Sequence, residues 1–338
     1  MEAILLALIC LTLIPNAFVA GLHDVPNAIA IPVRTRALTA LAASRVAATF
    51  NALGVLLALP LGIYLYTWFD FPQMEPRLLL AVVLCAAVSL LSWNLFTYMR
   101  GMPTSTTHAL LAAFLGGTLA ASTVADLDFR EVLAMPWAGA ALTLLLSPLI
   151  AFGLAYLLVF LAVRFARGED PDAVNTTSRM VQSVSVGVTS LGTGLQQGQR
   201  LSFVLLTALM AGGVEDAQSW LPAAYVAFAV LIGAGCLTGG WRIGHTLGHR
   251  LVEIDPLRGM VATTTTSALL FIGSLGFALP LSTSLTAAST IIGAGSNQRF
   301  ATVHWRAFRK ICLYWVLTPL AAGTATATLT LAMSPLLG

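Results

Sequence analysis

Charged residues are scarce in this chain: they make up 9% of its 338 residues, whereas hydrophobic residues make up 58% and the mean hydropathy is +0.87. Soluble domains average about 25% charged residues, so the composition excludes an ordinary soluble fold. The formal net charge of +3 is too small to favour nucleic acid as a partner. Apolar runs of about 20 residues recur along the chain without the alternation of outer-membrane strands. We therefore expect an all-α, multi-pass protein of a cell membrane, the cytoplasmic membrane in a bacterium, in contact with membrane lipid.

Cysteines and the short motifs of enzymes are scarce as well. The four cysteines, Cys10, Cys85, Cys236 and Cys312, stand singly in apolar runs, so neither a disulfide framework nor a metal-ligand spacing is visible. The chain carries no P-loop, nucleophile elbow or paired-histidine metalloprotease motif. The sequence therefore predicts no enzyme activity, no resident cofactor and no metal site.

Ten hydrophobic segments are predicted to be helical passes, and the first and sixth of them are interrupted. Their approximate ranges are 4–33, 46–67, 78–99, 103–121, 132–163, 180–213, 220–240, 259–279, 280–296 and 311–333. Most arginines and lysines fall in every second connection, and acidic residues fall in the others. The positive-inside bias makes the basic connections cytoplasmic, so both termini are expected to lie outside.

The polar segment 164–179 divides these passes into five and five. Because five is odd, residues 1–163 and 180–338 are expected to form two repeats of opposite orientation, joined by a cytoplasmic linker. Each repeat contains a short span that opens with the same cue, GMPTSTTHALLAAFLGG at 101–117 and ALPLSTSLTAASTIIGAG at 278–295. Pro103, Ser105 and Thr106 align with Pro280, Ser282 and Thr283. Paired, interrupted segments in inverted halves point to a secondary transporter with a site at the membrane midplane.

The first pass contains the polar stretch GLHDVPNAIA, residues 21–30. A charged side chain at the bilayer centre costs about 2.5–3.5 kcal/mol on insertion scales, so Asp24 needs a partner or a function inside the bundle. Pro15, Gly21 and Pro26 predict a helix that breaks near Asp24 and frees backbone groups as ion ligands. Asp24 and Asn27 would supply oxygen ligands for a small cation, or Asp24 would accept a proton. The alternative is that Asp24 only links two helices.

The Pro-x-Ser-Thr cue favours a different ligand. Proline suits a first helical turn, and hydroxyls there join free backbone N–H groups and the positive end of the helix dipole to form a cradle for an anion. Two such helix starts facing each other could hold one oxyanion. The alternative is that these Ser and Thr residues only cap helices or join membrane helices.

Three segments together resemble the PiT inorganic phosphate transporter family. They are GLHDVPNAIAIPVRTRALT at 21–39, WNLFTYMRGMPTSTTHALLAAFLGG at 93–117 and WVLTPLAAGTATATL at 315–329. The resemblance covers most of the chain and is clearest over residues 15–120. It implies a secondary transporter with inverted repeats that carries inorganic phosphate with Na⁺ or H⁺, in some bacterial members as a neutral metal-phosphate complex.

The resemblance also implies roles for individual residues. Asp24 and Asn27 would bind the cation and the substrate, and Asn94, in the Trp-Asn motif, would face the same site. The phosphate-binding hydroxyls would come from two hairpins, on Ser105, Thr106 and Thr107 in the first half and on Ser282 and Thr283 in the second. His23 and His108 would support the site.

The second half departs from the family pattern. Gly194 and Leu195 stand where the family has Asn and Asp, Leu285 stands where it has His, and Gln197 alone keeps the pattern. Arg200 lies nearby in a segment that should be buried. Arg200 could replace one bound cation, either by pairing with Asp24 or by contacting the anion through two hydrogen bonds. The alternative is that Arg200 reaches toward a membrane interface.

Three functions follow from these features. The first is a phosphate permease coupled to Na⁺ or H⁺, in which one half rocks against the other around the midplane site. The second is a permease of the same fold for sulfate or another oxyanion. The third is a paralogue that does not transport and acts as a membrane partner, favoured by the missing second acid. The coupling ion, its stoichiometry and the question of a homodimer stay open at this stage.

Overall fold

The computed structural model describes residues 1–62, 71–125, 132, 137–276, 281–298 and 303–336, with the side chains of 137–144 and 274–275 left out. These residues form an all-helical bundle, and the β structure described is one isolated bridge between Val252 and Val303. The helices of the first half are α1 (Glu2–Asp24), α2 (Pro26–Arg34), α3 (Ala40–Leu61), α4 (Pro76–Met99), α5 (Thr106–Ser122) and α7 (Trp137–Phe165).

The second half begins with the longest helix. Its elements are α8 (Pro171–Ala211), η2 (Ala217–Trp220), α9 (Leu221–Leu237), α10 (Trp241–His245), η3 (Thr246–Arg250), α11 (Pro256–Phe271), η4 (Ile272–Gly276), α12 (Thr283–Ser296), α13 (Trp305–Met333) and η5 (Ser334–Leu336). Several of these helices begin after a residue that caps the helix N-terminus. Asp170 caps α8 by accepting a hydrogen bond from the Ala173 N–H, and Asp255 caps α11 in the same way through the Arg258 N–H.

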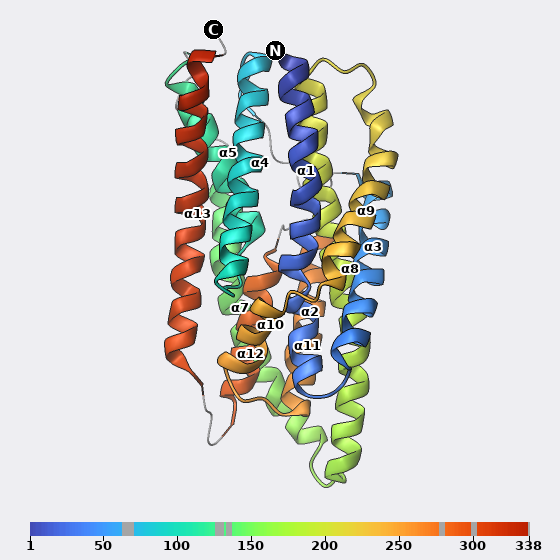
Figure 1. Ribbon diagram of the computed structural model, residues 1–338. Helices are drawn as coiled ribbons and strands as arrows, with labels where there is room; N and C mark the ends of the chain where they lie inside the picture. The colour runs from blue at the N-terminus through green and yellow to red at the C-terminus, as the bar shows by residue number, and fades with distance from the viewer. Residues whose placement is uncertain (63–70, 126–131, 133–136, 277–280, 299–302, 337–338) are drawn as a thin grey trace.

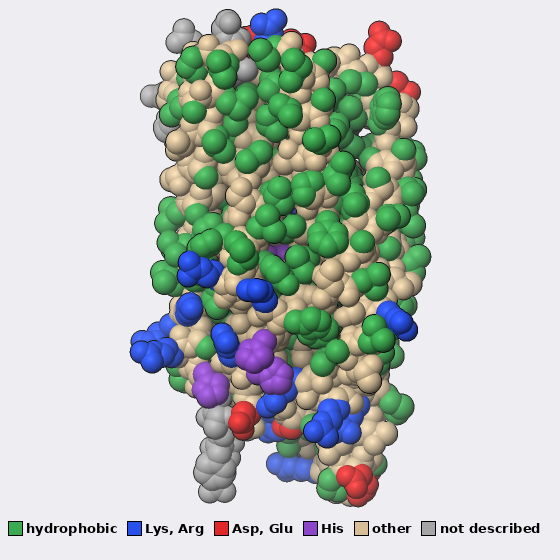
Figure 2. Space-filling model, in the orientation of Figure 1, with side chains coloured by type: hydrophobic (Ala, Val, Ile, Leu, Met, Phe, Trp, Pro, Cys, Tyr) green, Lys and Arg blue, Asp and Glu red, His purple; other side chains and the backbone are tan. Residues whose placement is uncertain are grey.

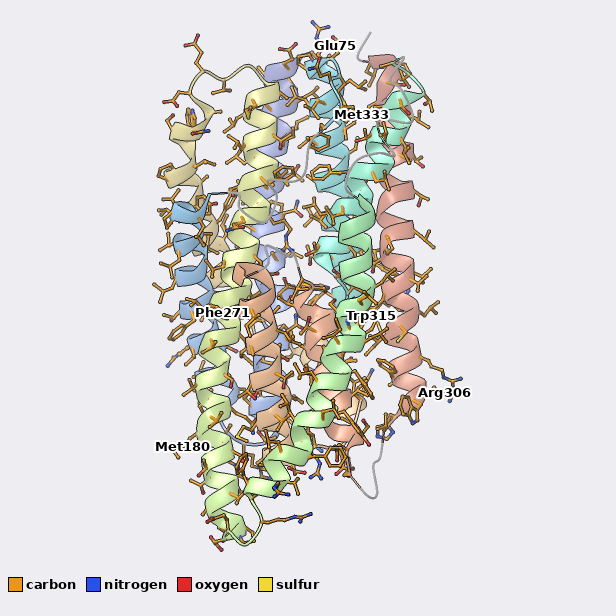
Figure 3. The ribbon with its side chains drawn as sticks, turned by 180° about the vertical axis from the view of Figure 1, so that it is seen from behind. Glu75, Met180, Phe271, Arg306, Trp315 and Met333 are labelled. Carbon is orange, nitrogen blue, oxygen red and sulfur yellow. The ribbon has the colours of Figure 1, made fainter. Side chains whose placement is uncertain are left out.

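Both termini lie at one end of the bundle (Figure 1). Glu75 at the start of α4 and Met333 at the end of α13 lie at this end, whereas Met180 and Arg306 lie toward the other (Figure 3). On the face drawn in Figure 2, nearly all Lys and Arg side chains gather in the half away from the termini, and the rest of that surface is mainly hydrophobic. The charge separation expected from the connections is therefore present, and the assignment of the basic end to the cytoplasm stays a prediction.

Six helical segments among the described residues are long and apolar enough to cross a membrane. α5 and α12 are shorter: 17 and 14 residues give about 26 and 21 Å at 1.5 Å per residue, less than the roughly 30 Å of a hydrocarbon core. α5 packs on α4, and α12 packs on α11. Each pair therefore forms a helical hairpin whose second helix is too short for a full pass. Pro280, at the opening of the second hairpin, lies outside the described residues.

Of the two predicted interruptions, the one in the first pass is present and the one in the sixth pass is absent. Only Val25 separates α1 from α2, and its φ of −54° and ψ of −35° are helical. Its N–H bonds to the Gly21 carbonyl oxygen at 3.1 Å, but the next bonds across the junction run from the Ala28 and Ile29 N–H groups back to the Val25 carbonyl. The helix therefore breaks next to Asp24, as expected, although the backbone there keeps helical angles. The use of its free carbonyls as ion ligands stays a prediction. Pro26 removes one backbone donor without unwinding the chain. In the second half α8 is continuous, because its glycines keep the backbone N–H groups that proline would remove.

α1 crosses α9 at a pair of glycines. A Cβ on Gly21 would lie 2.1 Å from the Ile232 carbonyl oxygen, and a Cβ on Gly235 would lie 2.1 Å from the Phe18 carbonyl oxygen. Both distances are far below van der Waals contact, so only glycine fits. Small residues at crossings let membrane helices approach closely, which increases their packing contacts.

α3 crosses α8 with the same arrangement. A Cβ on Gly194 would lie 2.1 Å from the Asn51 carbonyl oxygen, and a Cβ on Gly54 would lie 2.2 Å from that of Leu191. The sequence spacing between glycine and carbonyl on each helix equals the spacing in the α1–α9 crossing. Gly21 and Gly194 therefore occupy matching positions, and they lie close to Asp24 and Gln197 on their own helices.

The two hairpins share a second matched contact. A Cβ on Gly116 of α5 would lie 2.2 Å from the Gly323 carbonyl oxygen of α13, and a Cβ on Gly293 of α12 would lie 2.3 Å from the Phe152 carbonyl oxygen of α7. α4, α5 and α13 thus form one group of helices, and α7, α11 and α12 form another. Each group combines helices from both sides of the segment 164–179, so the two sequence halves interleave.

The glycine crossings predict that a Gly→Ala substitution lowers the stability of the protein at a crossing but not at a glycine with free space around it. Gly194→Ala should destabilise the protein by about 1–3 kcal/mol, because the added methyl group meets backbone that can move only with the helix. Gly153→Ala is the matched control, since its Cβ would meet nothing within 4 Å. Thermal unfolding of the detergent-solubilised variants should show a lowered melting temperature for Gly194→Ala alone. Equal melting temperatures would contradict this packing.

Candidate functional site

A small polar cavity lies where α8 passes the junction of α1 and α2 and where α5 and α12 begin. Its lining residues are Asp24, Thr106, Thr107, Thr193, Gln196, Gln197, Arg200, Ser282 and Thr283. α5 extends from this region toward one end of the bundle and α12 toward the other (Figure 1). The structure therefore brings together the polar stretch of α1, the middle of α8 and the starts of both hairpin helices.

Asp24 is buried, with 3% of its surface exposed, and it contacts three side chains. The Gln197 Nε2 donates a hydrogen bond of 2.8 Å to Asp24 Oδ2. His23 Nδ1 lies 3.3 Å from Asp24 Oδ1, and Arg200 Nη2 lies 3.8 Å from Asp24 Oδ2. The carboxylate thus faces the protein interior, held between α1 and α8.

His23 connects this carboxylate to the first hairpin. Its ring is fully buried, and its Nε2 lies 3.2 Å from Thr97 Oγ1 and 3.3 Å from Thr104 Oγ1. Thr104 Oγ1 in turn donates to Thr97 Oγ1 at 3.1 Å. This chain of contacts fixes the His23 ring between Asp24 and the turn that joins α4 to α5.

Asn27 connects the α1–α2 junction to the second hairpin. Its Nδ2 donates to Ser284 Oγ at 2.9 Å and contacts Thr283 Oγ1 at 3.5 Å, both at the start of α12. The other amide atom, Asn27 Oδ1, is buried without a hydrogen-bond partner. Asn27 therefore presents an acceptor that the protein itself leaves unused.

The serines of the two cues cap their helices. Ser105 Oγ accepts a hydrogen bond of 3.1 Å from the His108 N–H, and Ser282 Oγ accepts one of 3.3 Å from the Leu285 N–H. These are N-cap contacts, as in the alternative interpretation of the cue. The threonines that follow differ: Thr106, Thr107 and Thr283 line the cavity, and Thr106 Oγ1 has no hydrogen-bond partner.

Arg200 is buried, with 4% of its surface exposed, and it lines the same cavity. The alternative in which this side chain reaches a membrane interface is therefore wrong. The Arg200 Nη2 group is within ion-pair distance of Asp24 but makes no hydrogen bond. Asp24 and Arg200 are the only buried acidic and basic side chains, histidine apart, among the residues that the structure describes.

Two residues expected at the site lie elsewhere. Asn94 is buried in α4 but does not line the cavity. His108 points to a separate, mainly apolar pocket formed with α7, α12 and α13, which Trp315 and Phe152 also line. His108 follows the cavity-lining Thr106 by two residues, about 200° around the helix, so its ring lies on the opposite face of α5.

Sequence analysis missed Thr193 and Gln196 of α8 and Thr97 and Thr104 around the first hairpin. Thr193, Gln197 and Arg200 are spaced four and three residues apart, which places them on one helical face. Helical periodicity through Arg200 would have identified Thr193. Thr97 and Thr104 carried no comparable signal, because their role depends on how α4 meets His23.

The cavity combines groups suited to opposite charges. The Arg200 guanidinium, the Thr106 hydroxyl and the starts of α5 and α12 are suited to an anion. The Asp24 carboxylate and the Gln197 amide oxygen are oxygen ligands suited to a small cation, and the Asn27 amide, which does not line the cavity, lies beside it against Thr283. Within the described part of the chain, no three His, Cys, Asp or Glu residues form a metal-binding group.

Comparisons with known proteins give one consistent result. A probable low-affinity inorganic phosphate transporter of Rhizobium meliloti is 32% identical over 312 residues, covering 92% of this chain and 91% of the relative. A protein of the same description from Bacillus subtilis is 31% identical over 327 residues, covering 94% of each chain. A solved structure described as the sodium-dependent phosphate transporter shares the fold, with a TM-score of 0.80 at 17% identity over 97% of this chain and 98% of that one.

The family description that matches the sequence covers nearly the whole chain. The description is "Phosphate transporter family", and the match extends over residues 20–326. The matched range includes the polar stretch of α1, both hairpins and most of α13. With its long apolar helices, the chain is a multi-pass membrane protein, and it belongs to the phosphate transporter family.

Proposed function

We propose that this protein is a secondary transporter that carries inorganic phosphate across the cytoplasmic membrane by symport with Na⁺ or H⁺. The observation that carries this proposal is the buried cavity in which one acid, one base and two helix starts converge inside an apolar bundle. Full-length relatives described as probable low-affinity inorganic phosphate transporters support phosphate as the substrate.

Anion binding rests on Arg200 and on the first turns of α5 and α12. A guanidinium matches two phosphate oxygens at once, and helix N-terminal ends attract negative charge. Thr106, Thr107, Ser282 and Thr283 place hydroxyls at those ends. Ser105 serves this site indirectly, because its cap orients the first turn of α5.

Cation coupling rests on Asp24 with Asn27 and Gln197. The carboxylate can bind Na⁺ together with amide oxygens, or it can accept a proton. His23 holds Asp24 from the side of the first hairpin. We place Asn94 and His108 outside the binding site, as supports of α4 and α5. A metal-phosphate complex as substrate would enter through the same oxygen ligands.

The matched glycine contacts support two inverted repeats, 1–163 and 180–338. Gly21 corresponds to Gly194 by its crossing, so Asp24 corresponds to Gln197 and Asn27 corresponds to Arg200. By this match the second acid is replaced at Gln197, not at Leu195 as the sequence comparison suggested. The two halves interleave, so a movement of one sequence half against the other would break the closest crossings. We propose instead that access alternates by movement of the two helix groups α4–α5–α13 and α7–α11–α12 against α1, α3, α8 and α9.

The hydroxyl of Thr106 provides one test of the binding site. Thr106→Val should raise the KM for phosphate about 10- to 150-fold, the effect of losing one charge-assisted hydrogen bond of roughly 1.5–3 kcal/mol. Thr118→Val is the matched control, because Thr118 lies on the same helix with a buried, unpartnered hydroxyl outside the cavity. Uptake of radiolabelled phosphate into proteoliposomes would measure both KM values. Equal KM values for the two variants would remove Thr106 from the site.

Separate ion gradients test the function itself. Proteoliposomes that contain the protein should accumulate labelled phosphate under an inward Na⁺ gradient or an inward proton gradient, and the effective gradient identifies the coupling ion. Empty vesicles are the control. If neither gradient drives flux above that control, the protein does not transport phosphate, and the interpretation as a non-transporting membrane partner gains support.

Sulfate competition tests the choice of oxyanion. Phosphate changes its protonation near neutral pH and sulfate does not, so a site selective for phosphate should exclude excess sulfate across the neutral range. We expect labelled phosphate uptake to be unchanged by sulfate and blocked by unlabelled phosphate. Inhibition by sulfate equal to that by phosphate would instead favour a general oxyanion permease.

A further inference from the structure

The charges inside the cavity cancel. Asp24 and Arg200 carry the formal charges among the lining residues, one of each sign, and both are at least 95% buried by side chain. A site with no net charge has little reason to attract either a lone cation or a lone anion from water. Each ligand must therefore compete with the opposite charge that is already present in the protein.

The pair is close, but its geometry is not that of a structural salt bridge. Arg200 Nη2 lies 3.8 Å from Asp24 Oδ2 and donates no hydrogen bond, because Gln197 Nε2 occupies Oδ2 at 2.8 Å. A buried ion pair repays its desolvation cost only with good geometry and with further hydrogen bonds. Asp24 has its own hydrogen bonds to Gln197 and His23, but no hydrogen bond joins Arg200 Nη2 to Asp24, so little direct contact energy opposes the separation of the pair.

The unpartnered atoms around the pair fall into two complementary sets. Arg200 Nη2 and Thr106 Oγ1 can donate hydrogen bonds, and Asn27 Oδ1 and Gln197 Oε1 can accept them or bind a cation. Arg200 and Thr106 both line the cavity, the Gln197 amide already bonds to Asp24, and the Asn27 amide contacts Thr283 on the cavity wall. Separation of Asp24 from Arg200 would thus leave two sites, each with ligands of the correct kind.

We propose that Asp24 and Arg200 form an internal ion pair that stands in for both cargoes and is exchanged for them. Phosphate takes the place of Asp24 against the Arg200 guanidinium, and a cation takes the place of Arg200 against Asp24, Asn27 Oδ1 and Gln197 Oε1. This inference rests on the proposed function and adds its coupling rule. Either ligand alone would leave a buried charge unpaired, so phosphate and the cation bind together.

The exchange also fixes the charge carried per cycle. One monovalent phosphate and one monovalent cation leave the net charge of the site unchanged at zero.

The groups that face Asp24 are His23, Arg200, Gln197 and, on α9, Cys236, whose Sγ lies beside the Gly21 carbonyl. When the coupling ion is a proton, Asp24 is its acceptor and Arg200 is the group released.

The Asp24→Asn variant distinguishes this exchange from a model in which Asp24 only binds the ions directly. Asparagine keeps the shape of aspartate and removes the internal competitor for Arg200, so the variant should bind phosphate about tenfold more tightly than the wild type in Na⁺-free alkaline buffer. It should also lose any dependence of phosphate affinity on Na⁺ and keep only the pH dependence that comes from the ionisation of phosphate itself. Isothermal titration of inorganic phosphate into the purified full-length protein measures both effects. Were Asp24 merely a ligand of the bound ions, its loss would weaken phosphate binding.

Asp255→Asn is the matched control. Asp255 pairs with Arg258 outside the cavity and caps α11, a role that asparagine fills equally well. It should leave phosphate affinity and its cation dependence at wild-type values. Arg200→Gln should weaken phosphate binding at least tenfold, and the Asp24→Asn/Arg200→Gln double variant should bind weakly and without cation dependence.

The wild-type protein tests the same rule without any substitution. Phosphate affinity should rise in proportion to the concentration of the coupling cation, which corresponds to uptake of about one cation for each phosphate bound. The exchange is overturned if the phosphate affinity of the wild type does not depend on the cation, or if Asp24→Asn binds phosphate no more tightly than the wild type. Either result leaves the proposal of phosphate transport intact. Wild-type protein that binds no phosphate under any condition would overturn both.

Discussion

A charge inside a membrane protein must be compensated by the protein itself, because lipid offers neither water nor counterions. Among the described residues, Asp24 and Arg200 are the acidic and basic side chains to which this constraint applies. They come from α1 and α8, far apart in the sequence, and they meet at one small cavity. The burial of these two charges determines which helix faces turn inward, where the hairpins end and which ligands can enter.

The close helix crossings hold α1 and α8 in position beside the cavity, and with them Asp24 and Arg200. Gly21 and Gly194 bring α1 against α9 and α8 against α3 at backbone distance, each a few residues from the charged pair. The hairpin helices are held in a matching way by Gly116 and Gly293. Because each helix group mixes the two halves of the chain, the cavity lies between interleaved elements. This interleaving underlies our proposal that the cavity opens by movement of helix groups rather than of sequence halves.

The sequence predicted the features that follow from local chemistry. The cost of a buried carboxylate identified Asp24, and helix-start rules identified the hydroxyls around Thr106 and Thr283. The continuity of α8 was missed, because glycine weakens a helix but keeps the hydrogen bonds that proline removes. The contribution of Gln196 and the displacement of His108 follow from helix rotation. Packing against other helices sets that rotation, and local sequence does not encode it.

The central claim is that phosphate separates Asp24 from Arg200 and lies between the starts of α5 and α12. Arsenate has the shape and charge of phosphate, and its anomalous X-ray scattering locates it without ambiguity. A crystal structure with arsenate should show the arsenic atom between these helix starts, with Arg200 contacting the anion and withdrawn from Asp24. Arsenic elsewhere, or in the cavity with the Asp24–Arg200 pair still closed, would contradict the account.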